Sequence, residues 1–333
     1  MQTLPDPMID ALERMDLLKG ARAKGEPLTG GVSSDIWRVE LPSGSICIKR
    51  ALPKLRVAAT WLAPLERNIY EARWIRAAGR AVPSAVPELL GQDAVTGMLA
   101  MAYLPPERYP VWKSQLSAGL VDVAFAASVA ATLARIHAAT AADPAMAQEF
   151  PTDQIFYDIR LEPYLVQVGR AHPAVAARMQ TLIEITQRNK HCLVHGDVSP
   201  KNILCGPDNP VFLDAECAWW GDPAFDLAFC LNHLLLKCLW VPAVRSLLLA
   251  SFEAMAATYL RLVDWEPAAA LAARAARLLP ALLLARVDGK SPVEYITDDA
   301  QRSQVRAVAQ KLLADPCDQL ADVAQAWTKE ITT

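Results

Sequence analysis

The sequence predicts an α+β protein of two lobes, a small antiparallel sheet with a helix followed by a larger and mostly helical lobe. In the first hundred residues, short β-type runs alternate with turns around one clear helical segment. After Pro105-Pro106 the composition shifts toward alanine and leucine, and helical periodicity takes over. These observations place a boundary near 104, which separates an amino-terminal lobe, 1–103, from a carboxyl-terminal lobe, 104–333.

Length and charge limit the class of protein. A chain of 333 residues with 53% apolar content can fill a sizeable core. Its 33 Lys and Arg residues against 36 Asp and Glu residues leave a formal charge of -3, so no basic field attracts nucleic acid or anionic lipid. We therefore expect neither a nucleic-acid nor a membrane partner, and the composition leaves the oligomeric state open.

The amino terminus and the cysteines favour a cytoplasmic protein. The first twenty residues carry acids and prolines rather than the basic and apolar segments of a secretory signal. Charged residues and a proline interrupt the most apolar stretches, 227–240 and 271–287, which are therefore expected to be buried helices. The seven cysteines are odd in number and contain no C-x-x-C pair, as is typical of reduced core thiols.

The amino-terminal elements follow from turn and periodicity signals. Two β-type runs, 35–41 and 45–50, are joined by Pro42-Ser43-Gly44, which predicts a hairpin. Pro64 opens a segment of helical spacing that Gly79 is placed to end. Residues 87–104 predict two more strands around a Val-Thr-Gly turn. The expected lobe is a small antiparallel sheet with one helix packed on it.

The carboxyl-terminal lobe is predicted to be helical with one exception. Helical periodicity covers 116–139, 171–189 and most of 223–330. Between them, 192–217 contains the three short strand-like pieces "CLVH", "NILCG" and "VFLDAE". Strands inside a helical lobe indicate a local structure that serves the loops between them.

These loops carry the chemistry. Asp197 and Asn202 are five residues apart in "LVHGDVSPKNILCG", and Asp214 follows twelve residues later at the end of an apolar run. An amide oxygen and a carboxylate are hard ligands suited to Mg²⁺, which takes few protein ligands together with phosphate oxygens and water. A separate carboxylate, Asp197, would remain for a substrate hydroxyl.

The pattern His195-Gly196-Asp197-x-x-x-x-Asn202, with Asp214 in "FLDAE" and the trailing "GDPAFDLAF", resembles the catalytic segment of the aminoglycoside phosphotransferase family. The relatives of that family include choline kinases and methylthioribose kinases, and all share a bilobal protein-kinase-like fold. The resemblance covers roughly 25–240. It implies a nucleotide-binding amino-terminal lobe and a catalytic and substrate-binding carboxyl-terminal lobe.

The resemblance implies roles in the catalytic loop. Asp197 would orient the attacking hydroxyl or also accept its proton, and Asn202 and Asp214 would hold Mg²⁺ between the phosphates of ATP. His195 would be structural rather than a proton carrier. Asp226 would brace the loop through hydrogen bonds, although a carboxylate at a helix start is also an ordinary cap.

It also implies a nucleotide site in the amino-terminal lobe. Lys49 would contact the α- and β-phosphates, with Glu71 as its ion-pair partner in preference to Glu66 in the first helical turn. The remaining members of the predicted site are the phosphate-covering loop, with Gly30, Gly31 and Ser33 or Ser34, and the interlobe hinge, with Met101 and Tyr103. Met101 and Tyr103 are equally compatible with plain strand core. The preference between ATP and GTP stays open.

The acceptor is expected to be small. Only "AECAWW" lies between Asp214 and Gly221, which leaves no room for the activation segment that holds a peptide in protein kinases. The residues expected near the mouth of an acceptor pocket are Glu216, Trp219, Trp220 and Asp222. Aromatic rings beside acids bind cations or stack on sugars and bases, but both tryptophans are equally compatible with packing inside the lobe.

The leading hypothesis is an ATP- and Mg²⁺-dependent kinase that phosphorylates a hydroxyl of an antibiotic, an amino alcohol or a sugar-type metabolite. The alternative is a catalytically silent nucleotide-binding pseudokinase. It is weakened because every polar residue of the implied site is present, whereas a decayed site would have lost one. A structural metal or turn site in an unrelated α/β protein is a third interpretation.

Overall fold

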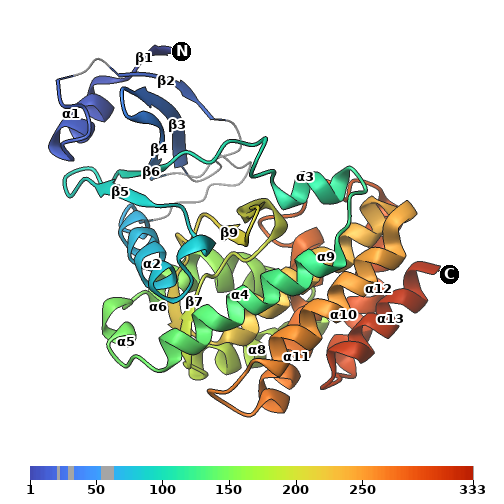
Figure 1. The fold of residues 1–333 in the computed structure, drawn as a ribbon. Helices are drawn as coiled ribbons and strands as arrows, with labels where there is room; N and C mark the ends of the chain where they lie inside the picture. The colour runs from blue at the N-terminus through green and yellow to red at the C-terminus, as the bar shows by residue number, and fades with distance from the viewer. Residues whose placement is uncertain (21–22, 29–33, 54–63, 333) are drawn as a thin grey trace.

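The computed structural model describes residues 1–20, 23–28, 34–53 and 64–332 and shows two lobes (Figure 1). The amino-terminal lobe contains a six-stranded antiparallel sheet with the strand order β1-β2-β3-β4-β6-β5. Its strands are β1 (Gln2–Thr3), β2 (Lys24–Pro27), β3 (Ser34–Leu41), β4 (Gly44–Ala51), β5 (Leu89–Gln92) and β6 (Leu99–Ala102). The predicted sheet is confirmed, and β1 and β2 extend it beyond the predicted strands.

Both predicted hairpins are present. β3 and β4 pair from Ser34↔Ala51 to Leu41↔Gly44, and Gly44 adopts φ +124°, which a residue with a side chain rarely takes. Because side chains alternate across a strand, Ile46 and Ile48 enter one apolar cluster, whereas Cys47 contacts another on the opposite face. Lys49 shares the second face, toward the helix that carries Glu71.

In the described part of this lobe, two helices are packed where a single one was predicted. α1 (Asp6–Arg14) buries Met8, Ala11 and Leu12 against the sheet. This spacing is helical, but it spans only nine residues and was not predicted. α2 (Arg67–Ala81) continues through Gly79 and ends before Val82-Pro83, so the predicted stop at Gly79 is wrong. Pro83 ends the helix more effectively than Gly79, because the ring of a proline clashes with the preceding residue and disfavours a helical backbone conformation there.

The carboxyl-terminal lobe is built from helices, as predicted. Long helices α4, α9, α10 and α11 pack on one another, with α12 and α13 outside them (Figure 1). The helices are α3 (Trp112–Ser117), α4 (Val123–Ala141), α5 (Met146–Glu149), α6 (Asp153–Phe156), α7 (Gln167–Ala171), α8 (Ala176–Arg188), α9 (Pro223–Trp240), α10 (Arg245–Arg261), α11 (Ala268–Asp288), α12 (Asp299–Ala314) and α13 (Leu320–Thr332). Shorter 3₁₀ turns are η1 (Pro83–Ala85), η3 (Pro173–Val175), η4 (Pro200–Asn202) and η5 (Pro242–Val244), and η2 (Tyr157–Val166) is a π-helical segment. The helical structure of 153–171 was not predicted.

Short strands interrupt this lobe where the sequence placed them. β7 (Cys192–Val194), β8 (Ile203–Cys205) and β9 (Pro210–Phe212) are the three predicted pieces. A fourth strand, β10 (Trp219–Gly221), was not predicted and pairs with β7, while β8 pairs with β9. These two small sheets fix both ends of the loop that carries Asp197 and Asn202.

Among the described residues, two helices are long and apolar enough to cross a membrane by length and composition alone, or three spans result if α9 and the bent segment 242–261 after it are taken as one. The two helices are α4 and α11, whose most apolar windows have mean hydropathies of 1.3 and 1.6. In the structure, 50% of the α4 window and 67% of the α11 window are buried within the protein. The stretches 227–240 and 271–287 form the buried helices that were expected.

Candidate active site

The floor of the site is the loop that follows β7, and Asp226 holds its backbone. Asp226 lies in the first turn of α9 and accepts hydrogen bonds from the backbone N–H groups of His195 (2.6 Å) and Gly196 (2.8 Å). Gly196 has φ +77°, and a Cβ at this position would lie 2.5 Å from the carbonyl oxygen of Cys217. The bracing predicted for Asp226 is therefore seen in the structure.

His195 links the two halves of the motif. Its Nδ1 accepts a hydrogen bond from the N–H of Asp197 (3.1 Å), and its Nε2 donates to the carbonyl of Leu213 (3.0 Å). Burial lowers the pKa of His195, so the ring is neutral and its single proton is committed to Leu213. This geometry fits a structural histidine rather than a proton carrier.

Asp197 lies between two cations. Its Oδ2 is 3.0 Å from Arg160 Nη2 and 3.0 Å from Lys201 Nζ. Burial raises the pKa of Asp197, but Arg160 and Lys201 lower it by more, so the carboxylate stays ionised. Arg160 also donates to the carbonyls of Gly196 and Ile159 and is itself almost fully buried. Arg160 therefore fixes both the charge of Asp197 and the position of its loop.

Asn202 and Asp214 are brought together by their backbones. The Leu213 N–H donates to the Asn202 carbonyl (2.8 Å), and Asn202 Nδ2 donates to the Asp197 carbonyl (3.1 Å). Asp214 adopts φ +67°, an uncommon conformation for a residue with a side chain. Because the amide nitrogen of Asn202 is bound to the loop, its oxygen remains to accept or coordinate.

Lys49 joins the amino-terminal lobe to this floor. Its Nζ is 2.7 Å from Glu71 Oε2 and also pairs with Asp214. Burial lowers the pKa of Lys49, but the carboxylates of Asp214, Glu71 and Glu216 raise it above its ordinary value. Burial also raises the pKa of Glu71 to about 7. The structure thus brings Lys49, Glu71, Asp197, Asn202 and Asp214 into one site, and no member of that set points elsewhere.

The structure describes only some of the other residues that were predicted to bind the nucleotide. Gly30, Gly31 and Ser33 lie outside the described residues. Ser34, at the start of β3, has a buried Oγ without a hydrogen-bond partner in the part of the chain that the structure describes. Met101 packs with Ala72 and Leu99 on the sheet, and Tyr103 lies beneath the Arg38 guanidinium at 4.8 Å.

The residues predicted to touch the acceptor mostly make internal contacts. Trp219 is 1% exposed and stacks on Phe156 with ring centroids 4.3 Å apart, so its assignment to substrate binding is corrected to core packing. Trp220 packs against the same core while partly exposed. Glu216 Oε2 is 2.9 Å from Arg67 Nε of α2, and Asp222 forms a bidentate pair with Arg274. In this structure the Glu216 side chain forms an ion pair that connects the helical lobe to α2.

The sequence analysis did not predict two residues of the site. Arg160 belongs to η2 and Arg67 to α2, and no motif marks either one. A weaker signal was available, because Arg160 is the single basic residue in the mostly apolar run "IFYDIRLEPYLV". A charge that a buried segment retains is usually paired or functional.

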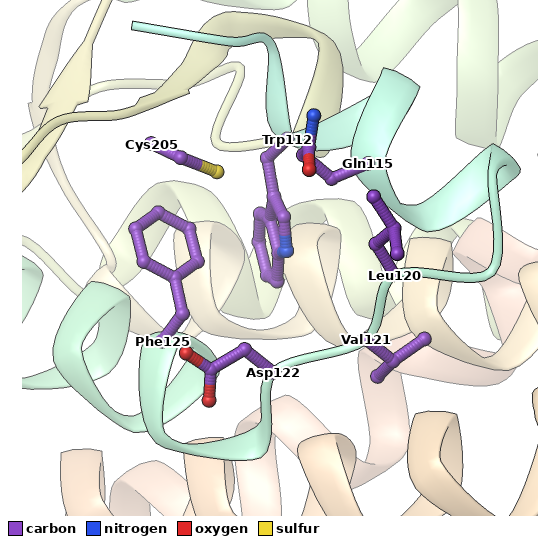
Figure 2. Close-up of a pocket in the computed structure, with 7 residues that line it drawn as sticks. All are labelled: Trp112, Gln115, Leu120, Val121, Asp122, Phe125 and Cys205. Carbon is purple, nitrogen blue, oxygen red and sulfur yellow. The ribbon is translucent and has the colours of Figure 1, made fainter. Parts of the chain in front are cut away.

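An apolar hollow lies beside the site rather than in it. Its lining residues are Trp112 and Gln115 of α3, Leu120 to Asp122, Phe125 of α4 and Cys205 of β8 (Figure 2). The cavity has a volume of about 380 Å³. None of the residues predicted for nucleotide, metal or acceptor lines it. Burial raises the pKa of the Cys205 thiol to about 11, so this cysteine is not an activated nucleophile.

Residues 24–271 match the model of the Phosphotransferase enzyme family (APH), and the chain belongs to this family. The predicted family and fold are thereby confirmed, and the interpretation as an unrelated α/β protein is wrong.

Curated relatives and solved structures agree with this family. Methylthioribose kinases 1 and 2 of Oryza sativa subsp. japonica are each 23% identical over 231 residues, which cover 60% of this chain and 53% of those proteins. The match thus spans about half the length of these relatives. The amicoumacin kinase hAmiN, solved with AMP-PNP, Ca²⁺ and Ami, aligns with a TM-score of 0.58 at 13% identity over 97% of both chains. Spectinomycin phosphotransferase APH(9)-Ia, solved with ADP and spectinomycin, aligns with a TM-score of 0.52 at 12% identity over 98% of this chain and 100% of that chain. These structural likenesses show the shared fold.

Proposed function

We propose that this protein transfers the γ-phosphoryl group of ATP to a hydroxyl of a small molecule in a Mg²⁺-dependent reaction. One observation carries the proposal. Lys49 of the sheet lobe and Asp197, Asn202 and Asp214 of the helical lobe gather at one crease, linked by the contacts among them. The nucleotide-bound relatives of the same fold support ATP as the donor. The complete polar set gives no support to the pseudokinase alternative.

The donor atoms fit a magnesium ion. Burial raises the pKa of Asp214, yet Lys49 and Lys201 hold it below its usual range, so the residue offers a carboxylate. Asn202 offers its remaining amide oxygen. Among the described residues, no group of three or more His, Cys, Asp and Glu side chains gathers as a metal site. That finding is compatible with magnesium, which binds through one or two protein ligands in phosphoryl-transfer sites.

The residues of the chain position the reactants. Phosphoryl transfer has a loose transition state, so alignment and charge neutralisation contribute most of the acceleration. A metal held by Asn202 and Asp214 would neutralise the phosphate oxygens. The carboxylates around Lys49 keep its ammonium group charged, so it would bind the phosphates from the amino-terminal lobe. Its ion pair with Glu71 would fix the direction of the side chain.

Asp197 orients the acceptor hydroxyl. Its carboxylate is ionised and 7% exposed, and Arg160 keeps it from rotating away from the crease. A hydroxyl that donates to Asp197 has its oxygen aimed at the phosphoryl group. Lys201, on the same carboxylate, brings a positive charge toward the oxygens that gain charge during transfer.

A nucleotide assay with an isosteric variant tests the proposal. ADP release with Mg·ATP is measured across aminoglycosides, amino alcohols, nucleosides, thiosugars and hydroxy acids, and the thermal shift with Mg·ADP is measured separately. Asp197→Asn should lower kcat by about 1,000-fold or more while the Mg·ADP shift remains, because the carboxylate that orients the hydroxyl is lost and Lys49, Asn202 and Asp214 stay in place. Full activity of the variant would refute the role of Asp197. Absence of any Mg-dependent nucleotide shift would refute the nucleotide site.

A further inference from the structure

One face of α9 runs from the catalytic loop into a second polar cluster. Asp226, Phe229, His233, Lys237 and Trp240 are spaced by three or four residues and therefore lie along a single stripe. The stripe begins where Asp226 binds the backbone of the catalytic loop. Lys237, near its other end, lies eleven residues further on, about 16 Å along the helix axis.

Direct contacts connect the two ends. Arg160, which holds Asp197, lies over the Phe229 ring at 5.7 Å. The Phe229 ring meets the His233 ring edge-on at 5.4 Å. His233 Nδ1 is 3.4 Å from the Tyr295 hydroxyl. The second cluster is therefore connected by side-chain contacts to Arg160, the residue that holds Asp197.

The cluster contains buried cations without carboxylate partners. Lys237 is 1% exposed, and its Nζ lies 4.3 Å from the Tyr295 ring centroid and 4.9 Å from that of Trp240. Arg286 of α11 is buried, donates to the Tyr164 hydroxyl and to Ser291, and leaves its Nε unpaired. Within the described part of the chain, no ion pair reaches either cation. Neither buried cation therefore has a carboxylate in direct contact among the described residues.

The surroundings of the cluster are also positive. The charges of Arg286, Lys237, Lys201 and Lys113 all act on His233 and, after burial, lower its pKa well below the ordinary value. The nearby carboxylate, Glu294, already pairs with Lys113 of α3. His233 Nε2 is buried without a hydrogen-bond partner among the described residues, and the tautomer in which Nδ1 accepts from the Tyr295 hydroxyl places the ring proton on Nε2. That N–H is an additional unused donor.

A purely structural role explains these groups poorly. An ammonium above two aromatic rings gains some cation–π stabilisation, but a buried charge without an anion costs several kcal/mol. A methionine would fill the same volume without that cost. Buried, unpaired polar groups beside a catalytic site indicate a ligand that completes them.

We propose that His233, Lys237 and Arg286 form a subsite for an anionic group, a carboxylate or a phosphate, carried by the acceptor. This inference rests on the proposed kinase function and specifies the chemical class of its substrate. The acceptor then presents its hydroxyl to Asp197 and its anion to Lys237, with Trp240 and Tyr295 beside the anion. The separation of the two ends along α9 requires an elongated molecule rather than a compact hydroxy acid.

Anion binding at this subsite is coupled to protonation. Burial, Lys113 and Arg286 lower the pKa of Lys237 to about 7, against the opposing effect of Glu294. A bound anion stabilises the ammonium form and draws a proton onto Lys237 near neutral pH. Without the anion, part of the population carries a neutral and nucleophilic amine.

Labelling with pyridoxal 5′-phosphate tests the subsite without an acceptor. This probe combines a phosphate with an aldehyde that forms an imine with neutral amines, and borohydride fixes the imine for peptide mapping. With Mg·ADP present to shield the nucleotide site, we expect Lys237 to be labelled at pH 7.5. Millimolar phosphate or citrate should slow the labelling at least fivefold, whereas chloride of equal ionic strength should not.

Matched controls make the result decisive. Unphosphorylated pyridoxal should label Lys237 far more slowly, and the exposed Lys311 of α12 should be labelled without anion protection. Protection by phosphate but not citrate would assign the group as a phosphate, and the reverse would assign a carboxylate. An unlabelled Lys237, or a labelling rate that neither anion changes, would overturn the inference.

Turnover with matched acceptors separates this inference from the proposed function. Elongated hydroxy acids and sugar phosphates, long enough to span the distance along α9, are compared with the matching primary amides and free sugars in the ADP-release assay. Lys237→Met should raise KM for the anionic acceptor about tenfold or more with a smaller change in kcat, and Lys311→Met should change neither. Efficient turnover of cationic or neutral acceptors alone, unaltered in Lys237→Met, would overturn the anionic class and leave the kinase function intact. Loss of all Mg·nucleotide binding in the wild-type protein would instead overturn the kinase function.

Discussion

At the scale of single residues, the charges buried in the helical lobe act on one another rather than on solvent. Arg160 and Lys201 lower the pKa of Asp197 against the opposing effect of burial. Lys49 has the same effect on Asp214. Because these carboxylates are desolvated, each one depends on its cation to remain ionised. Removal of a cation should therefore be visible in the pH dependence of the reaction.

Arg160→Gln should move the acidic limb of the kcat/KM profile to higher pH by about one unit or more. The variant removes an opposite charge from Asp197, so burial and the neighbouring Asp214 raise the pKa of Asp197. The measurement is ADP release between pH 4.5 and 9. Lys201→Met should shift the limb less, because its side chain is 47% exposed and its charge is screened by water. An unmoved limb with uniformly lower kcat would mean that Arg160 only shapes the loop.

Lys237→Met should stabilise the protein by about 3 kcal/mol near pH 6.5, and by less near pH 9.5. In the folded protein the pKa of Lys237 is lowered to about 7 from 10.5. The cost of burying the charge is therefore absent above the unfolded pKa, grows as the pH falls, and is complete below about 7. The charged and titratable groups around it are Lys113, Glu294, Arg286, His233 and Cys230. Urea denaturation at both pH values measures the difference, and equal stabilities at pH 6.5 would contradict the expectation.

At the scale of elements, the sequence predicted those structures that depend on residues close together in the chain. The β3–β4 hairpin followed from its turn residues, and the catalytic loop followed from the spacing of Asp197 and Asn202. Features that depend on packing were not predictable in this way. Whether Trp219 faces a pocket or the core depends on β10 pairing with β7, a contact between distant residues. The position of Arg160 depends in the same way on how η2 packs beneath the loop.

The catalytic loop depends on one backbone conformation. Gly196→Ala should destabilise the protein by at least about 2 kcal/mol and remove activity, because it combines a left-handed φ with a clash against the Cys217 carbonyl. Gly97→Ala is the matched control. Gly97 has φ +70° but no atom within 4 Å of the added Cβ, so only the backbone cost of about 1 kcal/mol applies. Urea denaturation of both variants separates the clash from the conformation, and equal losses would rule out the clash.

At the scale of the whole molecule, a few polar contacts join the two lobes. Lys49 pairs with Asp214, and Arg67 of α2 pairs with Glu216 after β9. α2 also contributes Trp74 and Ala78 to the apolar core of the helical lobe. The helix that carries Glu71 is therefore anchored in both lobes, and the crease is held in a defined shape.

Glu216→Ala should lower the free energy of unfolding by about 2 kcal/mol, because a buried charge-assisted contact with the Arg67 guanidinium is lost. Urea denaturation provides the measurement. Glu26→Ala, which removes a 44% exposed partner of Arg38, should cost less than about 1 kcal/mol. A Glu216→Ala variant of normal stability with a raised acceptor KM would restore the original assignment of Glu216 to substrate binding.

Because the stripe lies on a single helix, α9 would contribute both to phosphoryl transfer and to recognition of the acceptor. Its first turn sets the loop at which the phosphoryl group would be transferred, and its last turns carry the side chains that would recognise the far end of the acceptor. The length of the helix between these two ends would then set the distance between the hydroxyl and the anionic group of an accepted compound. Substitutions at 233, 237 and 240 would retune which compounds are accepted without disturbing the reaction machinery. A single-residue insertion between 229 and 233 would rotate the recognition end by about 100° and so uncouple recognition from catalysis.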